Sequence, residues 1–69
     1  MKIEIKLAKL LESKSISQRE LARQTGVRLA SINEMCQNDI IRLTLDNLAK
    51  ICDALNCDIS DILELDRHD

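Results

Sequence analysis

The feature that most constrains this chain is its single glycine, Gly26, in a sequence that contains no proline. Glycine is the residue best suited to the left-handed backbone at which helices often stop. The Ser-Gln-Arg-Glu run at residues 17–20 has the form of a capping box. In that motif the Ser17 hydroxyl accepts from the Glu20 amide, and the Glu20 carboxylate accepts from the Ser17 amide. The pattern therefore predicts a helix over residues 17–25 that ends at Gly26.

A second helix is expected directly after this stop, over residues 29–36. Its inward positions are apolar, together with a residue of the preceding turn: Val27, Ile32 and Met35. The opposite face carries a mixture of small, polar and acidic side chains: Leu29, Ala30, Asn33, Glu34 and Gln37. A merely solvated helix more often carries Lys and Glu pairs at i,i+4 spacing, so this mixed face is typical of a surface that reads a partner.

The N-terminal part of the chain gives two signals. Ile3 and Ile5 alternate with charged residues, which is strand-like, whereas the leucines that follow recur at helical spacing. We expect a helix over residues 5–13. Whether the residues before it form a strand stays open at this stage, and an alternating apolar edge of that kind invites pairing with another chain.

The C-terminal half predicts two further helices. Asn38 suits a left-handed position in a loop over residues 37–43, and Thr44 suits the start of a helix that ends at Asn56. Its expected buried stripe is Leu45, Leu48, Ile51, Cys52 and Leu55. Asp58 and Asp61 cap a short helix, from which Ile59, Ile62 and Leu63 are expected to pack back; residues 65–69 are expected to be a tail. Hydrophobic residues left for the core or a dimer contact are Ile3, Ile5, Ile40, Ile41 and Leu65.

Composition excludes several classes of function. The 69 residues suffice for one domain, residues 1–69, with 45% hydrophobic and 32% charged residues. No apolar run is long enough to span a membrane, and charged residues interrupt any signal-peptide pattern at the start. Because the chain has no Phe, Tyr or Trp, it cannot stack single-stranded bases on aromatic rings.

The formal net charge of −2 conceals an asymmetry. Residues 1–36 hold seven Lys or Arg and four Glu, a balance of +3, whereas residues 37–69 hold three Lys or Arg and eight Asp or Glu, a balance of −5. Lys14, Arg19, Arg23 and Arg28 lie close together along the chain, opposed only by Glu20. This excess of basic residues in the N-terminal half favours an anionic partner for one face of the molecule.

The residues predict no enzyme, no metal site and no cofactor. Cys36, Cys52 and Cys57 lack the short paired spacing of zinc ligands, and two of them lie at apolar stripe positions. An odd number of cysteines also argues against a disulfide framework and for a reducing compartment, so we expect a cytoplasmic protein. The acidic residues near the C-terminus are explained by capping and solvation rather than by catalysis.

Taken together, the spacing resembles that of a known family. Two helices around a glycine turn form a helix-turn-helix pattern, here residues 17–36. Its members Gln18, Leu21, Ala22, Gly26, Val27 and Ile32 are similar to the core of the Cro/CI-type (lambda-repressor-like, XRE) DNA-binding domains. The apolar pattern from Leu45 to Leu63 is similar to the last two helices of that family. The resemblance covers about residues 6–64 and implies an all-α, five-helix domain. A short extended segment before the first helix is compatible with it.

The resemblance also implies a function: a sequence-specific regulator of transcription, expected to be a bacterial or phage repressor, that binds double-stranded DNA as a homodimer. The first residues of the second helix in the motif read base edges in the major groove; here they are Leu29, Ala30, Asn33 and Glu34. The residues expected to contact the DNA backbone are Gln18, Arg19, Arg28, Gln37, Asn38 and Arg42.

The chain departs from the family pattern at positions that affect the expected base contacts, and two alternative functions stay open. The family often has Ser or Thr where this chain has Arg28, which predicts a weak cap, and Glu34 adds repulsion near phosphates. One alternative is the antitoxin of a toxin–antitoxin pair. The other is a protein-interaction module that kept the fold without binding DNA, in which case the partner is a protein.

Overall fold

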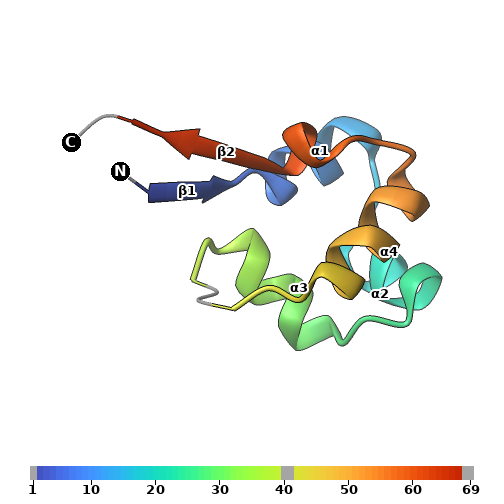
Figure 1. The fold of residues 1–69 in the computed structure, drawn as a ribbon. Coiled ribbons are helices and arrows are strands. Elements are labelled where there is room, and N and C mark those ends of the chain that lie inside the picture. The colour runs from blue at the N-terminus through green and yellow to red at the C-terminus, as the bar shows by residue number, and fades with distance from the viewer. Residues whose placement is uncertain (1, 40–41, 68–69) are drawn as a thin grey trace.

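Five helices and two short strands make up the described part of the chain, residues 2–39 and 42–67 of a computed structural model (Figure 1). The helices are α1 (Leu7–Lys14), α2 (Gln18–Thr25), α3 (Leu29–Cys36), α4 (Leu45–Leu55) and α5 (Ile59–Ile62). The strands are β1 (Lys2–Ile5) and β2 (Leu63–Asp66). The expected five-helix fold is confirmed, and the extended N-terminal segment exists as β1.

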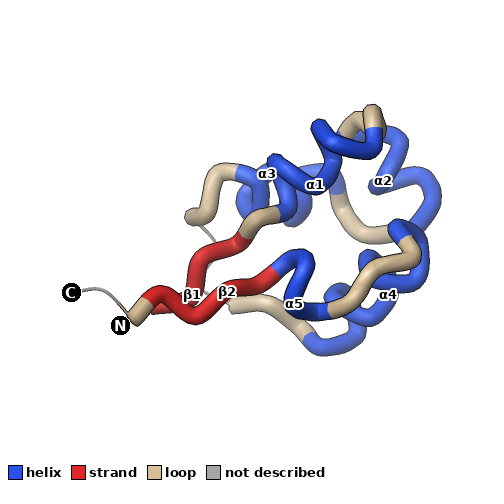
Figure 2. Tube along the Cα trace, turned by 90° about the horizontal axis from the view of Figure 1, so that it is seen from above, coloured by secondary structure: helices blue, strands red, loops and turns tan. Residues whose placement is uncertain are grey.

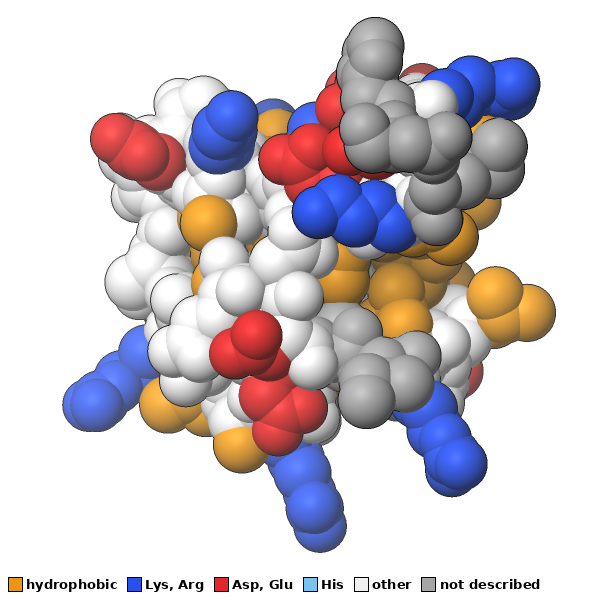
Figure 3. Space-filling view, turned by 90° about the vertical axis from the view of Figure 1, so that its left-hand side faces the viewer, with side chains coloured by type: hydrophobic (Ala, Val, Ile, Leu, Met, Phe, Trp, Pro, Cys, Tyr) orange, Lys and Arg blue, Asp and Glu red, His pale blue; other side chains and the backbone are white. Residues whose placement is uncertain are grey.

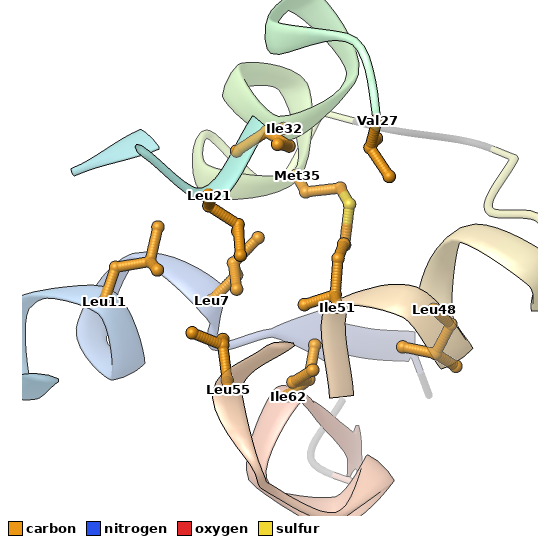
Figure 4. Packing of buried hydrophobic residues seen from close by; sticks show 10 residues of the cluster. All are labelled: Leu7, Leu11, Leu21, Val27, Ile32, Met35, Leu48, Ile51, Leu55 and Ile62. Carbon is orange, nitrogen blue, oxygen red and sulfur yellow. The ribbon is translucent and has the colours of Figure 1, made fainter. Parts of the chain in front are cut away.

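The core is built from hydrophobic side chains of all five helices and of the turn before α3 (Figure 4). Its fully buried members are Leu7, Leu21, Ile32, Met35, Ile51 and Ile62. No polar or charged side chain is buried among the described residues. Each buried side chain of this size stabilises the fold by about 1.5–3 kcal/mol, so these few contacts hold the helices together.

Two residues expected in the core lie at the surface instead. Leu45 is 83% exposed because it occupies the first turn of α4, and the buried stripe of that helix begins only at Leu48. Ile59 is 58% exposed because α5 is a single turn, which directs only Ile62 into the core. Ile40 and Ile41, named as core or interface candidates, lie outside the described residues.

The two strands join the ends of the chain in an antiparallel ribbon that projects from the helices (Figures 1 and 2). Ile5 faces Leu63 and Ile3 faces Leu65, and the Lys6 amide donates to the Ile62 carbonyl at 2.6 Å. Two expectations are therefore wrong. The first helix begins at residue 7, not 5, because Ile5 is engaged in the sheet. Residues 65 and 66 belong to β2 rather than to a tail.

The helix ends follow local capping chemistry. The Thr44 hydroxyl accepts from the Asn47 amide at 3.1 Å, and the Asp61 carboxylate accepts from the Asp58 amide at 2.9 Å, as expected. Asn38 adopts the predicted left-handed backbone with φ of 63°, and Asn56, the expected end of its helix, is also left-handed with φ of 51°. None of the helices described is long and apolar enough to cross a lipid bilayer.

Candidate nucleic-acid interface

The first turn of α2 is held by one half of the expected capping box. The Ser17 hydroxyl accepts from the Glu20 amide at 3.0 Å. The Glu20 carboxylate does not return to Ser17; it accepts from Arg23 Nε at 2.9 Å and from Gln24 Nε2 at 3.0 Å. The reciprocal bond predicted from the motif is therefore wrong, because a guanidinium one turn along the helix is the stronger partner for the carboxylate.

This ion pair changes the electrostatics of α2. Hydrogen bonds from Arg23 and Gln24 hold the pKa of Glu20 below its ordinary value, and the same carboxylate raises the pKa of Arg23. Both side chains are exposed, so the pair adds little stability. Its effect is to neutralise one of the four cations in the basic stretch. Arg19 and Arg28 form no ion pair within residues 2–39 and 42–67.

The turn between α2 and α3 is fixed by two adjacent residues. Gly26 has the predicted left-handed backbone, with φ of 77°, and its amide donates to the Ala22 carbonyl at 2.9 Å. Thr25 was not singled out from the sequence. Its hydroxyl donates to the Leu21 carbonyl at 2.8 Å and accepts from the Val27 amide at 3.1 Å. Thr25 therefore positions the start of α3, and a threonine beside a helix-ending glycine was the signal for this role.

Helix α3 presents the face predicted from its sequence. Ile32 and Met35 are buried, which fixes the rotation of the helix about its axis. The opposite side chains are exposed, Leu29 to 41%, and include Ala30, Asn33 and Glu34. Arg28 precedes the helix without a side-chain hydrogen bond to it, in agreement with the weak cap expected there. The first amides of α3 therefore have no cap from Arg28.

A shallow, open hollow lies between the start of α2 and the outer face of α3. Its walls come from both helices of the motif: Gln18, Arg19, Leu29, Ala30 and Asn33. Three of these were predicted to contact bases and two to contact the DNA backbone. The hollow therefore combines an amide, a guanidinium and small apolar groups, which is the chemistry that reads base edges beside a phosphate.

The remaining predicted site residues lie outside this hollow. Gln37 is linked to it, because its Nε2 donates to Asn33 Oδ1 at 3.4 Å. Asn38 turns towards the ribbon, where its Oδ1 accepts from the Ile5 amide at 3.0 Å. Glu34, Arg28 and Arg42 are exposed without lining the hollow.

The three cysteines are free thiols, each partly buried. Burial raises the pKa of the Cys36 thiol; burial and the adjacent Cys52 thiol raise that of Cys57. Neutral thiols at such positions behave as small hydrophobic groups. Within the described ranges, no three His, Cys, Asp or Glu side chains gather as a metal site would require.

Comparison with known proteins agrees with this geometry. Residues 6–67 match the family model of the Cro/C1-type helix-turn-helix DNA-binding domain. A crystal structure from Bacteroides fragilis, provisionally described as that of a DNA-binding protein, is similar with a TM-score of 0.80 and 27% sequence identity. The similarity covers 91% of this chain and 100% of that one. No curated protein matches. The chain belongs to the Cro/C1-type helix-turn-helix DNA-binding domain family.

Proposed function

We propose that this protein is a sequence-specific transcriptional regulator, a repressor, that inserts α3 into the major groove of double-stranded DNA and acts as a homodimer. The observation that carries the proposal is the hollow between α2 and α3, where base-reading and phosphate-binding chemistry are side by side. The three free, partly buried thiols favour a reducing compartment, and so a cytoplasmic site of action.

Each exposed side chain of α3 has a partner among the base edges of the major groove. Asn33 suits adenine, to which an amide can both donate and accept, and Glu34 suits the amine of cytosine. Ala30 and Leu29 suit the methyl group of thymine. Gln37 Nε2 donates to Asn33 Oδ1, which restrains the Asn33 amide and leaves its NH2 group and the second lone pair of Oδ1 for a base.

Phosphate contacts are assigned to polar and cationic groups at the border of this face. Gln18 and Arg19 lie at the start of α2, and Arg28 precedes α3 without an ion pair among the described residues. Asn38 uses its oxygen for Ile5, so only its amide NH2 is left to donate to a phosphate. Gln37 and Arg42 complete the set of backbone contacts.

Selection of bound duplexes from a random library, followed by sequencing, tests the proposal. We expect an enriched motif with two inverted half-sites about 34 Å apart, the spacing at which a symmetric dimer meets the same groove twice. Asn33→Ala should relax the preference at one base pair, whereas Gln24→Ala, an exposed amide on α2, should leave the motif unchanged. No enrichment at low salt would overturn the proposal.

A protein-interaction role is favoured by one observation, the exposure of Leu45 and Ile59. Exposed apolar side chains of this size are common contact points for a protein partner. If this module or an antitoxin is the right description, Leu45→Ser should abolish binding of a protein partner. In the repressor that we propose, Leu45→Ser leaves the enriched DNA motif and its affinity unchanged.

A further inference from the structure

The outer edge of strand β1 offers backbone groups that no other residue within 2–39 and 42–67 pairs. In an antiparallel ribbon, successive residues point their amide and carbonyl groups alternately to the partner strand and away from it. The Lys6 amide donates to the Ile62 carbonyl, towards β2, and the Ile5 amide donates to Asn38 on the other side. Ile3 therefore points its amide and carbonyl outwards, where they have no partner within residues 2–39 and 42–67.

The ribbon also carries exposed apolar side chains and a pair of like charges. Ile3 and Leu65 face each other on the apolar side of the ribbon and are 60% and 45% exposed. On the polar side, Glu4 faces Glu64, a like-charge pair that weakens the ribbon. Figure 3, seen from the end of the molecule that carries the ribbon, shows hydrophobic side chains at the surface below a mixed group of charged ones.

We propose that β1 pairs antiparallel with β1 of a second copy of this chain, centred on Ile3, to form a four-stranded sheet across a two-fold axis. This deepens the proposed function, since it names the surface of the dimer. In this pairing the amide of each Ile3 donates to the carbonyl of the other Ile3. Lys2 of each chain then lies opposite Glu4 of the other, which gives each Glu4 a cationic neighbour.

Three other ways of joining two ribbons are less favourable than this register. A shift of two residues along β1 places Glu4 opposite Glu4 and requires the Ile5 amide, which Asn38 already holds. Pairing through the outer edge of β2 places Glu64 opposite Asp66 twice, acid against acid. A shift of one residue turns the apolar side of one strand against the polar side of the other. The register centred on Ile3 is the one with complementary charges.

The same geometry connects the dimer to α3. Asn38, two residues after the end of α3, binds the strand beside the proposed axis. Joining two ribbons therefore fixes the relative orientation of two α3 helices while their exposed faces stay uncovered. The paired edge is short, so the free dimer is weak, of the kind that forms at high protein concentration or on DNA.

Sedimentation equilibrium of the free protein, from micromolar to millimolar concentration and without DNA, tests the proposal. Ile3→Pro removes the outward amide but no bond to β2, and should raise the dimer dissociation constant by about tenfold or more. Leu65→Pro is the matched control on the outer edge of β2, and should leave the constant unchanged. Circular dichroism verifies that both variants are folded.

Exchanging the charges of residues 2 and 4 tests whether the two β1 strands pair in the proposed register, rather than only whether they pair at all. Glu4→Lys relieves the Glu4–Glu64 repulsion within the ribbon but places two Lys–Lys pairs beside the axis, so it should abolish the dimer, whereas Glu4→Lys with Lys2→Glu should restore it. A monomeric wild type at every concentration, an equal effect of Leu65→Pro, or no rescue by the exchange would each overturn the proposal. DNA binding by a folded monomeric variant to one half-site would leave the proposed function standing.

Discussion

The helix-turn-helix and the terminal ribbon are specified in different ways. The helix-turn-helix, residues 17–36, is fixed by contacts between residues close in sequence: Ser17 with Glu20, Thr25 with Val27, and Gly26 at the turn. The ribbon joins Ile3 to Leu65, near opposite ends of the chain, and its outer half leaves both side chains exposed. One region is locally determined and anchored in the core, whereas the other depends on the rest of the fold.

This difference suits the two tasks that we propose for these regions. A surface that reads bases must hold its side chains in one geometry, which local capping and a buried Ile32 and Met35 provide. A surface that joins two copies needs unpaired edges and exposed apolar groups, which weaken an isolated domain. The bond between Ile5 and Asn38 is where the two regions meet.

The largest contrast is expected from equal truncations in the two regions. Leu21→Ala removes a fully buried side chain of α2 and should lower the free energy of unfolding by about 2–5 kcal/mol. Leu65→Ala removes an exposed side chain of the ribbon and should change it by no more than about 0.5 kcal/mol. Urea unfolding monitored by circular dichroism measures both values. Similar losses would contradict the difference in anchoring.

Substitutions at Gly26 should destabilise the protein through the backbone conformation of the turn rather than through steric crowding. A Cβ at Gly26 would meet nothing within 4 Å, so Gly26→Ala is opposed only by its positive φ. We expect a loss of about 1–2 kcal/mol in the free energy of unfolding. Gly26→Asn should lose less, because asparagine tolerates this conformation. Equal losses for the two variants in urea unfolding would point to another cause.

The junction between the regions should have an intermediate effect. Asn38→Gly removes the acceptor of the Ile5 amide and keeps a residue suited to positive φ. We expect a loss of about 0.5–1.5 kcal/mol in unfolding free energy. Faster hydrogen exchange at the Ile5 amide should accompany it, with exchange in α2 changed only in proportion to global stability. An unchanged Ile5 amide would show that this bond does not join the regions.

Two arginines of the basic stretch should differ in their effect on DNA binding. Arg28→Gln removes a cation beside α3 that no described acidic residue pairs, and should reduce the slope of log affinity against log salt by about 1. Arg23→Gln should change the slope much less, because Glu20 already neutralises that charge. Fluorescence anisotropy of a labelled duplex over a salt series measures both slopes, and a reversed order would contradict the assignment.

The smallest effect is expected from pH. Because the folded pKa of Glu20 is lowered, its contribution to stability is present above its ordinary value of about 4.5. It is lost as the pH falls through the lowered folded pKa. Glu20→Gln should remove this part of the pH dependence, measured as urea midpoints between neutral and acid pH, and should leave the slope above pH 5 unchanged.

Much of the fold could be predicted because its signals are local. Ser17, Thr44 and Gly26 mark helix ends through their own chemistry, and the bounds of α3 match the expected range of residues 29–36. The left-handed Ser15 after α1 gave no such signal, because serine is not favoured there. Capping residues predicted the ends of α2 and α4, but not the start of the uncapped α1 or which partners the ends of the chain would meet.

The errors share a physical cause, which is that burial depends on distant neighbours. Leu45 has the spacing of a core residue, yet it is 83% exposed, since no residue that the structure describes covers its side chain in the first turn of α4. Strand β2 has no turn residue before it and pairs with the other end of the chain. At the site, the position of Asn33 followed from helical period, whereas the pairing of Arg23 with Glu20 depended on side-chain geometry.

Amide chemical shifts of the protein titrated with a duplex enriched by selection test the central claim most directly. If the hollow between α2 and α3 binds DNA, the largest changes lie at residues 17–19 and 28–34, and α5 and the second half of α4 stay nearly unchanged. The changes should fade together as salt is raised, since the release of counterions from neutralised phosphates makes the whole affinity depend on salt. Changes concentrated on α5 and the end of α4, or none at low salt, would contradict the account.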